Sequence, residues 1–474
     1  MATITVDPVT RIEGHLRVQV ETAAEGTVTS AKVAGQLYRD FENILVGRAA
    51  TDPVHLTQRV CGVCPVSHAI VASKTVEAAL RFTPNAQAQL LRALIQGGNF
   101  VQDHILHFYH LNLMDYIEGP AMAPWSGANT SDLRITGSDR ERLIANYLKA
   151  LDIRRKAQEM VAILAGKVPH VATVMPGGVT QSPSVAQMTA VKGLLAEVTT
   201  FVRDTYVPDA EFLASKYDDY FHIGRGAGAL LSFGVFDQPG STPLLKRGLI
   251  TAAGRRGIVD VKRIAEEVAR SYYTARPATA PAAGVTAPAF GKSGAYSWLK
   301  APRYAGGVYE VGPLARMTVN GDYKGGISVM DRTLARAYEA RKIVAAMGGW
   351  AARVQPGAKT FTPLGAVRGT AFGLTEAPRG ALGHWATFSA NKVSRYQMIT
   401  PTCWNASPRD GRGVPGTMEQ ALTGLRVADP AKPIELMRVV HSYDPCTGCS
   451  VHVTDVDGLS EHVTMLTPPS AAGR

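Results

Sequence analysis

Hydrophobic and polar residues alternate near the start of the chain and then follow a helical period. Between residues 15 and 37, apolar side chains occupy alternate positions on both sides of Gly26, a pattern typical of two strands joined by a turn. From Asn85 to about Asp115, apolar residues recur at intervals of three and four. We therefore expect a β-hairpin followed by a long helix, with a bend at the glycine pair 97–98.

Further helical patterns follow at intervals along the chain. Ser138 and Glu141 have the spacing of a capping box, and Ser182-Pro183 has the composition of another helix start. The predicted helices span residues 138–166, 182–206, 259–273 and 331–347. The pattern thus predicts a mainly α protein with peripheral β-structure, an α+β fold, organised as one large domain.

Composition narrows the function classes. The chain has 474 residues and a net charge of +11, but its basic residues are scattered, so no nucleic-acid groove is indicated. No run of about eighteen apolar residues predicts a transmembrane segment. The first residues lack a basic region followed by an apolar one, so we expect no export signal in this chain itself.

Two Cys-x-x-Cys pairs lie at opposite ends of the chain. Cys61 and Cys64 form the first, and Cys446 and Cys449 the second, which leaves Cys403 as the fifth cysteine. Two residues between thiols let both sulfurs reach one metal, so the pairs predict a four-thiolate site. Zinc usually staples a small domain with closely spaced pairs, and separate redox pairs need a different context. Nickel or iron redox chemistry is favoured, with structural zinc or redox disulfides as alternatives.

Five motifs around these cysteines occur in a characteristic order. They occupy residues 7–15, 59–68, 376–384, 401–410 and 444–452. Together they resemble the large, catalytic subunit of nickel–iron hydrogenases. The resemblance implies a large helical-bundle core of that type. It also implies an oxidoreductase that splits dihydrogen reversibly and heterolytically into protons and electrons.

The resemblance assigns the four paired cysteines to the metals. Cys61 and Cys446 correspond to terminal nickel ligands, whereas Cys64 and Cys449 correspond to ligands that also bridge to iron. In this family the iron carries carbon monoxide and cyanide as further ligands. Cys403 is expected to be a small buried side chain near the site rather than a fifth ligand.

The same resemblance assigns the residues that transfer the proton and the residue that provides a fixed positive charge. Cys446 is our candidate for the base that takes the first proton, and Glu13 corresponds to the carboxylate that relays it outward. Arg379 corresponds to a guanidinium beside the open metal position, with Asp103 and Asp444 as its acidic partners.

Four other positions match the surroundings of the metals. Pro378 belongs to the segment that overhangs the cofactor, and His68 is expected to donate to a cysteine sulfur. His104, His107 and His110 share a helix face and are interpreted as core residues with hydrogen bonds rather than as ligands.

A magnesium site is also implied by the resemblance. Glu42, the backbone carbonyl of Met398 and His452 match its protein ligands, and oxygen and imidazole donors suit a hard cation. We expect it to hold the C-terminal segment in place.

Partners follow from the cysteine count. Electrons leaving the nickel must reach an acceptor, and with four cysteines assigned to one site and Cys403 set aside, none is left for iron–sulfur clusters. The resemblance therefore implies a separate iron–sulfur small subunit, in at least a heterodimer. The resemblance further implies nickel-insertion factors and a maturation endopeptidase that cleaves after His452. The catalytic domain then spans residues 1–452, and residues 453–474 are a precursor extension.

Export with a signal-bearing small subunit predicts a location in the periplasm or on the periplasmic face of the membrane, with the cytoplasm as the alternative. A hydrogen-sensing complex with the same site, or a four-cysteine zinc scaffold, are the alternative functions.

Overall fold

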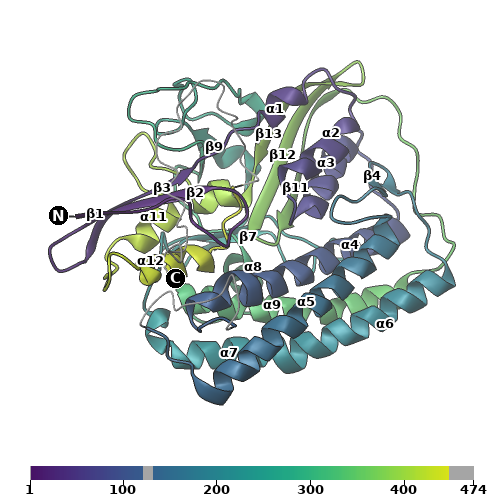
Figure 1. Cartoon of the computed structure of the whole chain (residues 1–474). Helices are drawn as coiled ribbons and strands as arrows, with labels where there is room; N and C mark the ends of the chain where they lie inside the picture. Colours follow the sequence, from purple (N-terminus) through teal and green to yellow (C-terminus); the bar gives the residue numbers. More distant parts are fainter. Residues whose placement is uncertain (1, 121–131, 448–474) are drawn as a thin grey trace, which may run out of the picture.

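Long helices form the body of the molecule. The computed structural model describes residues 2–120 and 132–447. Its longest helices run side by side at one end of the molecule (Figure 1). They are α4 (Ala86–Ile105), α5 (Gly137–Ala165), α6 (Val185–Phe201) and α9 (Val329–Arg353). Small sheets lie around this bundle, so the mainly α architecture with peripheral β-structure is confirmed.

Helix α4 is the centre of the bundle and confirms the predicted helix from Asn85. The Asn85 side chain caps it by accepting from the Ala88 amide at 2.9 Å, and a π-helical segment, η2 (Leu106–Asn112), continues it. Helix α4 continues through the glycine pair at residues 97–98, which has a role in packing. The predicted bend there stays a prediction. A Cβ on Gly97 would lie 2.8 Å from Met347, so α9 approaches this face too closely for a side chain.

The predicted helices at 138–166, 182–206 and 331–347 are present as α5, α6 and α9, although α9 continues beyond the predicted end to Arg353. Helix α5 begins after Thr136 and ends before Gly166, whose φ of +80° suits glycine, but no capping box forms at Ser138. The capping box instead forms at α6, between Ser184 and Gln187. Beyond the predicted end near residue 206, the chain continues through η4 (Val202–Tyr206) into α7 (Val207–Lys216).

The segment at 259–273 was predicted to be a helix, and that prediction was wrong. It contains one 3-10 turn, η6 (Val261–Arg263), followed by β9 (Ile264–Glu267), which pairs antiparallel with β10 (Ala301–Tyr304). Alternate residues of β9 are buried, and one of them is the charged Glu266. Because a polar residue lies on the buried face, the sequence lacks the alternation of apolar and polar residues that indicates a strand, and the segment resembled a helical pattern.

Two sheets carry residues of the predicted site. The predicted hairpin consists of β2 (Leu16–Thr22) and β3 (Val28–Gly35), with β1 (Ala2–Val6) added at its edge. The second sheet was not predicted and consists of β11 (Gly369–Ala377), β12 (Gly380–Ser389) and β13 (Lys392–Ile399).

Helix α3 (Pro65–Ala79) packs directly on β11 (Figure 1). A Cβ on Gly373 of β11 would lie 2.5 Å from the Val71 carbonyl oxygen, so the helix and strand backbones are nearly in contact. This contact joins the first cysteine pair, at the start of α3, to the sheet that carries Arg379.

The remaining helices are short. They are α1 (Phe41–Ile44), α2 (Asp52–Leu56), η1 (Thr57–Val60), η3 (Leu113–Asp115), η5 (Asp218–Phe221), η7 (Pro281–Ala283), α8 (Pro313–Asn320), α10 (Pro401–Asn405), α11 (Thr417–Leu422) and α12 (Ile434–Ser442). The remaining strands are β4 (Val174–Met175), β5 (Gly178–Val179), β6 (Leu230–Ser232), β7 (Gly248–Ile250) and β8 (Arg256–Gly257). None of the helices described here is both long and apolar enough to cross a lipid bilayer.

Candidate metal centre

Three of the four predicted sulfur ligands meet in the interior. Cys61 directly follows η1, Cys64 is the N-cap of α3, and Cys446 lies shortly after α12. Their Sγ atoms lie within 4.8 Å of one another, and the Cys61 and Cys446 sulfurs are 3.3 Å apart. All three side chains are buried. Cys449 and His452 lie outside the described residues, so their predicted roles stay predictions.

Backbone groups hold the sulfurs in place. The amides of Val63 and Cys64 both donate to the Cys61 Sγ at 3.2 Å, which favours a thiolate there. The Cys446 amide donates to the Thr402 hydroxyl at 2.9 Å, which ties the C-terminal pair to α10. Thr402 belongs to the 401–410 motif, but nothing in the sequence indicated this contact. Converging soft donors in a buried position suit a nickel, iron or zinc ion.

Arg379 lies beside this cluster between two acids, as predicted. It occupies the two-residue turn between β11 and β12, and it donates to Asp103 at 2.8 Å and to Asp444 at 2.9 Å. Burial opposes its charge, but both carboxylates and the sulfurs of Cys446 and Cys64 together raise the pKa of Arg379. The guanidinium is therefore a permanent buried cation at the edge of the sulfur cluster.

The two acids differ in their electrostatic surroundings. Burial raises the pKa of Asp103 to about 7 although Arg379 opposes the shift. Burial also acts on Asp444, but Arg379 and His107 outweigh it and lower the pKa of Asp444. Asp444 has a φ of +53°, a conformation that turns its side chain toward Arg379 directly before the second cysteine pair.

Glu13 lies next to the cluster through a backbone contact. Its carbonyl oxygen accepts from the Thr447 amide at 2.8 Å, and residue 13 pairs in parallel with Cys446. Burial and the nearby Cys61 raise the pKa of its carboxyl, while Arg379 and the Gly62 amide oppose that shift. A half-buried carboxyl at this position has the chemistry of a proton carrier.

His68 and Pro378 have other contacts than a sulfur or a metal. His68 Nδ1 lies 3.3 Å from His384 Nε2, and His384 is in turn 2.7 Å from the Tyr396 hydroxyl. His68 Nε2 has no hydrogen-bond partner within residues 2–120 and 132–447, so its predicted donation to a sulfur stays a prediction. The Pro378 carbonyl accepts from Arg316 at 2.7 Å.

His104 on α4 and His107 and His110 on η2 form hydrogen bonds within the protein, in agreement with their interpretation as residues that are not metal ligands. The Nε2 atom of His104 lies 2.8 Å from Glu339, that of His107 lies 2.6 Å from the His441 carbonyl, and that of His110 lies 3.2 Å from the Tyr147 carbonyl. Burial lowers the pKa of all three, which favours the neutral imidazole over the charged form.

Two predicted magnesium ligands meet in a small cavity of about 40 Å³. The Glu42 carboxylate accepts from the Met398 amide at 2.8 Å and from the Lys300 ammonium at 2.8 Å. Glu266 lines the same cavity, and its two oxygens have no hydrogen-bond partner in the described part of the chain. Buried oxygen donors fit a hard cation, although the ammonium group of Lys300 already neutralises Glu42.

Lys300 and Glu266 were not predicted from the sequence, since neither belongs to one of the five motifs. Cys403 lines this second cavity and not the sulfur cluster. Its thiol accepts from the Thr400 hydroxyl at 3.3 Å, and burial raises the pKa of this thiol to about 11. The expectation that it is not a fifth ligand therefore agrees with its position.

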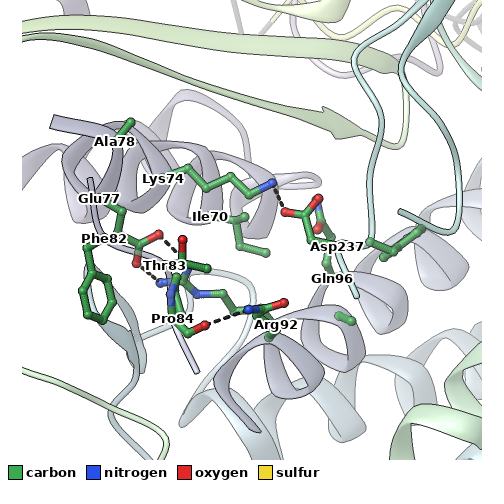
Figure 2. Close-up of a pocket in the computed structure, with 13 residues that line it drawn as sticks. Ile70, Lys74, Glu77, Ala78, Phe82, Thr83, Pro84, Arg92, Gln96 and Asp237 are labelled. Atoms are coloured by element: carbon green, nitrogen blue, oxygen red, sulfur yellow. Dashed lines mark hydrogen bonds and ion pairs between the residues drawn. The ribbon is translucent and has the colours of Figure 1, made fainter. Parts of the chain in front are cut away.

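A larger cavity of about 300 Å³ lies away from the cluster, between α3 and α4 (Figure 2). Arg92 and Glu77 form a two-pronged ion pair on its wall, and Lys74 pairs with Asp237 across it. The described residues that line this cavity include none of the predicted site residues. Its charges are mutually compensated, so it does not point to a charged ligand.

The fold and the cluster define a class: a buried cysteine centre that can hold a metal ion, with a fixed cation beside it and a carboxyl close by. Comparison with known proteins identifies the family. Residues 39–142, 138–325 and 320–452 match the family described as nickel-dependent hydrogenase, and residues 3–34 match a family described as HoxL-like. The chain belongs to the nickel-dependent hydrogenases and is an oxidoreductase that acts on dihydrogen.

Individual relatives agree along nearly the whole length. The chain is 38% identical to the periplasmic NiFeSe hydrogenase large subunit of Desulfomicrobium baculatum, over 98% of this chain and 97% of that one. It is 30% identical to the Hydrogenase-2 large chain of Escherichia coli K12, over 96% and 98%. The reduced Ni-Fe-Se hydrogenase of D. vulgaris Hildenborough superposes with a TM-score of 0.92 at 36% identity, over 95% and 100%.

Proposed function

We propose that this chain is the catalytic large subunit of a heterodimeric hydrogenase that splits dihydrogen heterolytically and passes the electrons to an iron–sulfur small subunit. The observation that carries the proposal is the buried sulfur cluster with Arg379 fixed at its edge. A structural zinc site needs no permanent cation beside its thiolates, whereas dihydrogen cleavage gains from a fixed charge at the reacting position.

Cys61, Cys64 and Cys446, together with Cys449, are the residues that would hold nickel and iron. Their burial and convergence fit these metals, and the amides that donate to Cys61 would stabilise it as a thiolate. When bound, the nickel–iron group would supply the acceptor for the hydride that remains when dihydrogen gives up one proton. The iron would carry carbon monoxide and cyanide, as the family resemblance implies.

The remaining chemistry concerns the proton. The Cys446 sulfur takes the proton released from dihydrogen, and Glu13 relays it outward. The backbone pairing of residue 13 with Cys446 supports this role by placing Glu13 next to the cluster, and the pKa of its partly buried carboxyl is raised. Arg379 orients the substrate, and Asp103 and Asp444 fix the orientation of its planar guanidinium group. Pro378 shapes the turn that overhangs the metals. His68 would donate a hydrogen bond to a cysteine sulfur of the cluster.

A second, hard cation, magnesium, would be held by Glu42, the Met398 carbonyl and His452. The contact of Glu42 with the Met398 amide supports this part of the proposal, because it brings both segments to one cavity. Its role would be to fix the C-terminal segment next to the sulfur cluster.

Assembly completes the proposal. Nickel-insertion factors would load the metal, and an endopeptidase would then cleave after His452 and remove residues 453–474. The mature chain would reach the periplasm with its small subunit, which the compartment named for the Desulfomicrobium relative supports.

The test is isotope exchange by the purified complex. With deuterium gas in ordinary water, we expect HD to form and viologen to be reduced at a rate that is proportional to nickel content. HD formation without electron transfer to viologen would indicate a sensor. A complex that forms no HD although it contains nickel would contradict the proposal.

A further inference from the structure

We propose that Arg316 is a positioning residue for Arg379, because it fixes the turn that carries the catalytic guanidinium. Arg316 lies on α8 and is fully buried. All five of its N–H groups donate hydrogen bonds to described residues. The inference rests on the proposed function of Arg379.

The contacts of Arg316 fall into two sets. Three bonds go to carboxylates: two to Glu339 on α9, both at 2.7 Å, and one to Glu376 on β11 at 2.8 Å. The other two go to backbone carbonyls, Ala377 at 3.0 Å and Pro378 at 2.7 Å. These two carbonyls directly precede Arg379, so Arg316 fixes the last two peptide groups before the catalytic side chain.

The turn is also supported from its other side. An ideal Cβ on Gly312, next to α8, would lie 3.0 Å from the Arg379 carbonyl oxygen. Gly380, which follows Arg379, has a φ of +140°, and a Cβ there would lie 2.4 Å from Val311. The segment that leads into α8 therefore contacts the turn closely, and Arg316 on the same helix bonds to it. One helix thus determines the position of the turn.

A stability role alone does not account for this arrangement. Replacing a buried ion network by apolar residues is often neutral or stabilising, so burial of one Arg and two Glu is weak evidence for stability. A planar fork that joins two carboxylates and two carbonyls instead fixes geometry. A displacement of about 1 Å in a reacting group is enough to slow catalysis roughly a hundredfold.

The chain offers a matched control on the wall of the cavity of about 300 Å³ between α3 and α4 (Figure 2). Arg92 forms the same two-pronged pair with Glu77, and it also donates to two backbone carbonyls, those of Met175 and Gly178. These carbonyls belong to the β4–β5 turn and not to the turn of Arg379. Arg92→Lys therefore damages a comparable buried network without touching the proposed positioning contact.

The experiment compares Arg316→Lys with Arg92→Lys in the complete metal-loaded complex. Lysine has one ammonium group and cannot reach both carbonyls and both carboxylates. Per nickel, we expect Arg316→Lys to lower kcat about tenfold with an unchanged KM for dihydrogen, and Arg92→Lys to stay within about twofold of wild type. Wild-type kcat in Arg316→Lys, or equal losses in both variants, would overturn the inference.

A double variant separates positioning from an independent effect. If Arg316 acts through Arg379, Arg316→Lys combined with Arg379→Lys should be no slower than Arg379→Lys alone. Losses that multiply would show independent action and refute the inference. If Arg316→Lys fails to load nickel, Glu376→Gln takes its place. We expect this variant to lose at least about threefold in kcat with the same non-additivity, and wild-type turnover would again overturn the inference.

The catalytic role of Arg379 and the positioning role of Arg316 can be refuted separately. Wild-type turnover in fully metallated Arg379→Lys would overturn the proposed role of Arg379 itself. An impaired Arg379→Lys variant beside a fully active Arg316→Lys variant would overturn only the positioning role of Arg316.

Discussion

Replacement of Arg379 by lysine keeps the positive charge but removes the planar guanidinium group, which bonds to two acids. The guanidinium bonds to Asp103 through one terminal nitrogen and to Asp444 through the other, at 2.8 and 2.9 Å, in a fully buried position. A lysine ammonium is a single point charge on a flexible chain, so it can satisfy one acid well or both poorly. The positive charge therefore moves away from its place beside the sulfurs.

The expected magnitude follows from these two bonds. A hydrogen bond to a charged partner contributes about 1.5–3 kcal/mol. Loss of one bond, with displacement of the charge, therefore costs about 3 kcal/mol of transition-state stabilisation. Since about 1.4 kcal/mol corresponds to a tenfold change in rate, turnover should fall by about a hundredfold or more.

The assay is hydrogen oxidation per nickel, measured on matched preparations of wild type, Arg379→Lys and the Arg92→Lys control. Normalising to nickel is essential, because loss of metal imitates loss of catalysis. We expect normal metal loading and tail removal in all three proteins. A fully metallated Arg379→Lys variant with near wild-type turnover would show that this residue is only a structural cation for two buried acids.

Three other changes test separate parts of the account. Serine in place of any one of the four predicted sulfur ligands should abolish nickel retention and block tail removal; normal nickel in any of them would refute its assignment. Glu13→Gln should leave nickel content normal but abolish HD formation and turnover, and full activity would place the proton relay elsewhere. Burial raises the pKa of Glu419 from 4.5 to about 7. The folded chain thus holds this proton more tightly than the unfolded chain does, and stability falls by up to about 3 kcal/mol as pH rises through that range. The drop in Tm from pH 5 to pH 8 should therefore be smaller in Glu419→Gln, and an equal drop would contradict this reasoning.

Long periodic patterns were sufficient to predict the hairpin and the bundle helices, whereas short or uniformly buried strands were not predicted. The helix α4 and strands β2 and β3 have one clear buried face each, which produces a readable period. Most of β12 is buried on both faces, so it shows no alternation, and β9 places a charged residue inside. These elements depend on tertiary partners that a local pattern does not contain.

The candidate site was likewise predicted in part from the sequence. The motifs were enough to predict that Cys61 and Cys446, 385 residues apart, would meet, and their sulfurs lie 3.3 Å from each other. Arg316 was missed because it lies outside the five motifs and the predicted helices, and an arginine without a motif is usually a solvated surface charge. Only the packing of α8, α9 and β11 shows that it bonds to the turn of Arg379.

The most direct test of the account is the metal content of the purified complex, measured for wild type and for Cys446→Ser. If the converging thiolates hold a nickel–iron centre, wild type should contain about one nickel per large subunit with little zinc, and Cys446→Ser almost none. One equivalent of zinc without nickel in the wild type, or wild-type nickel in Cys446→Ser, would contradict the central claim.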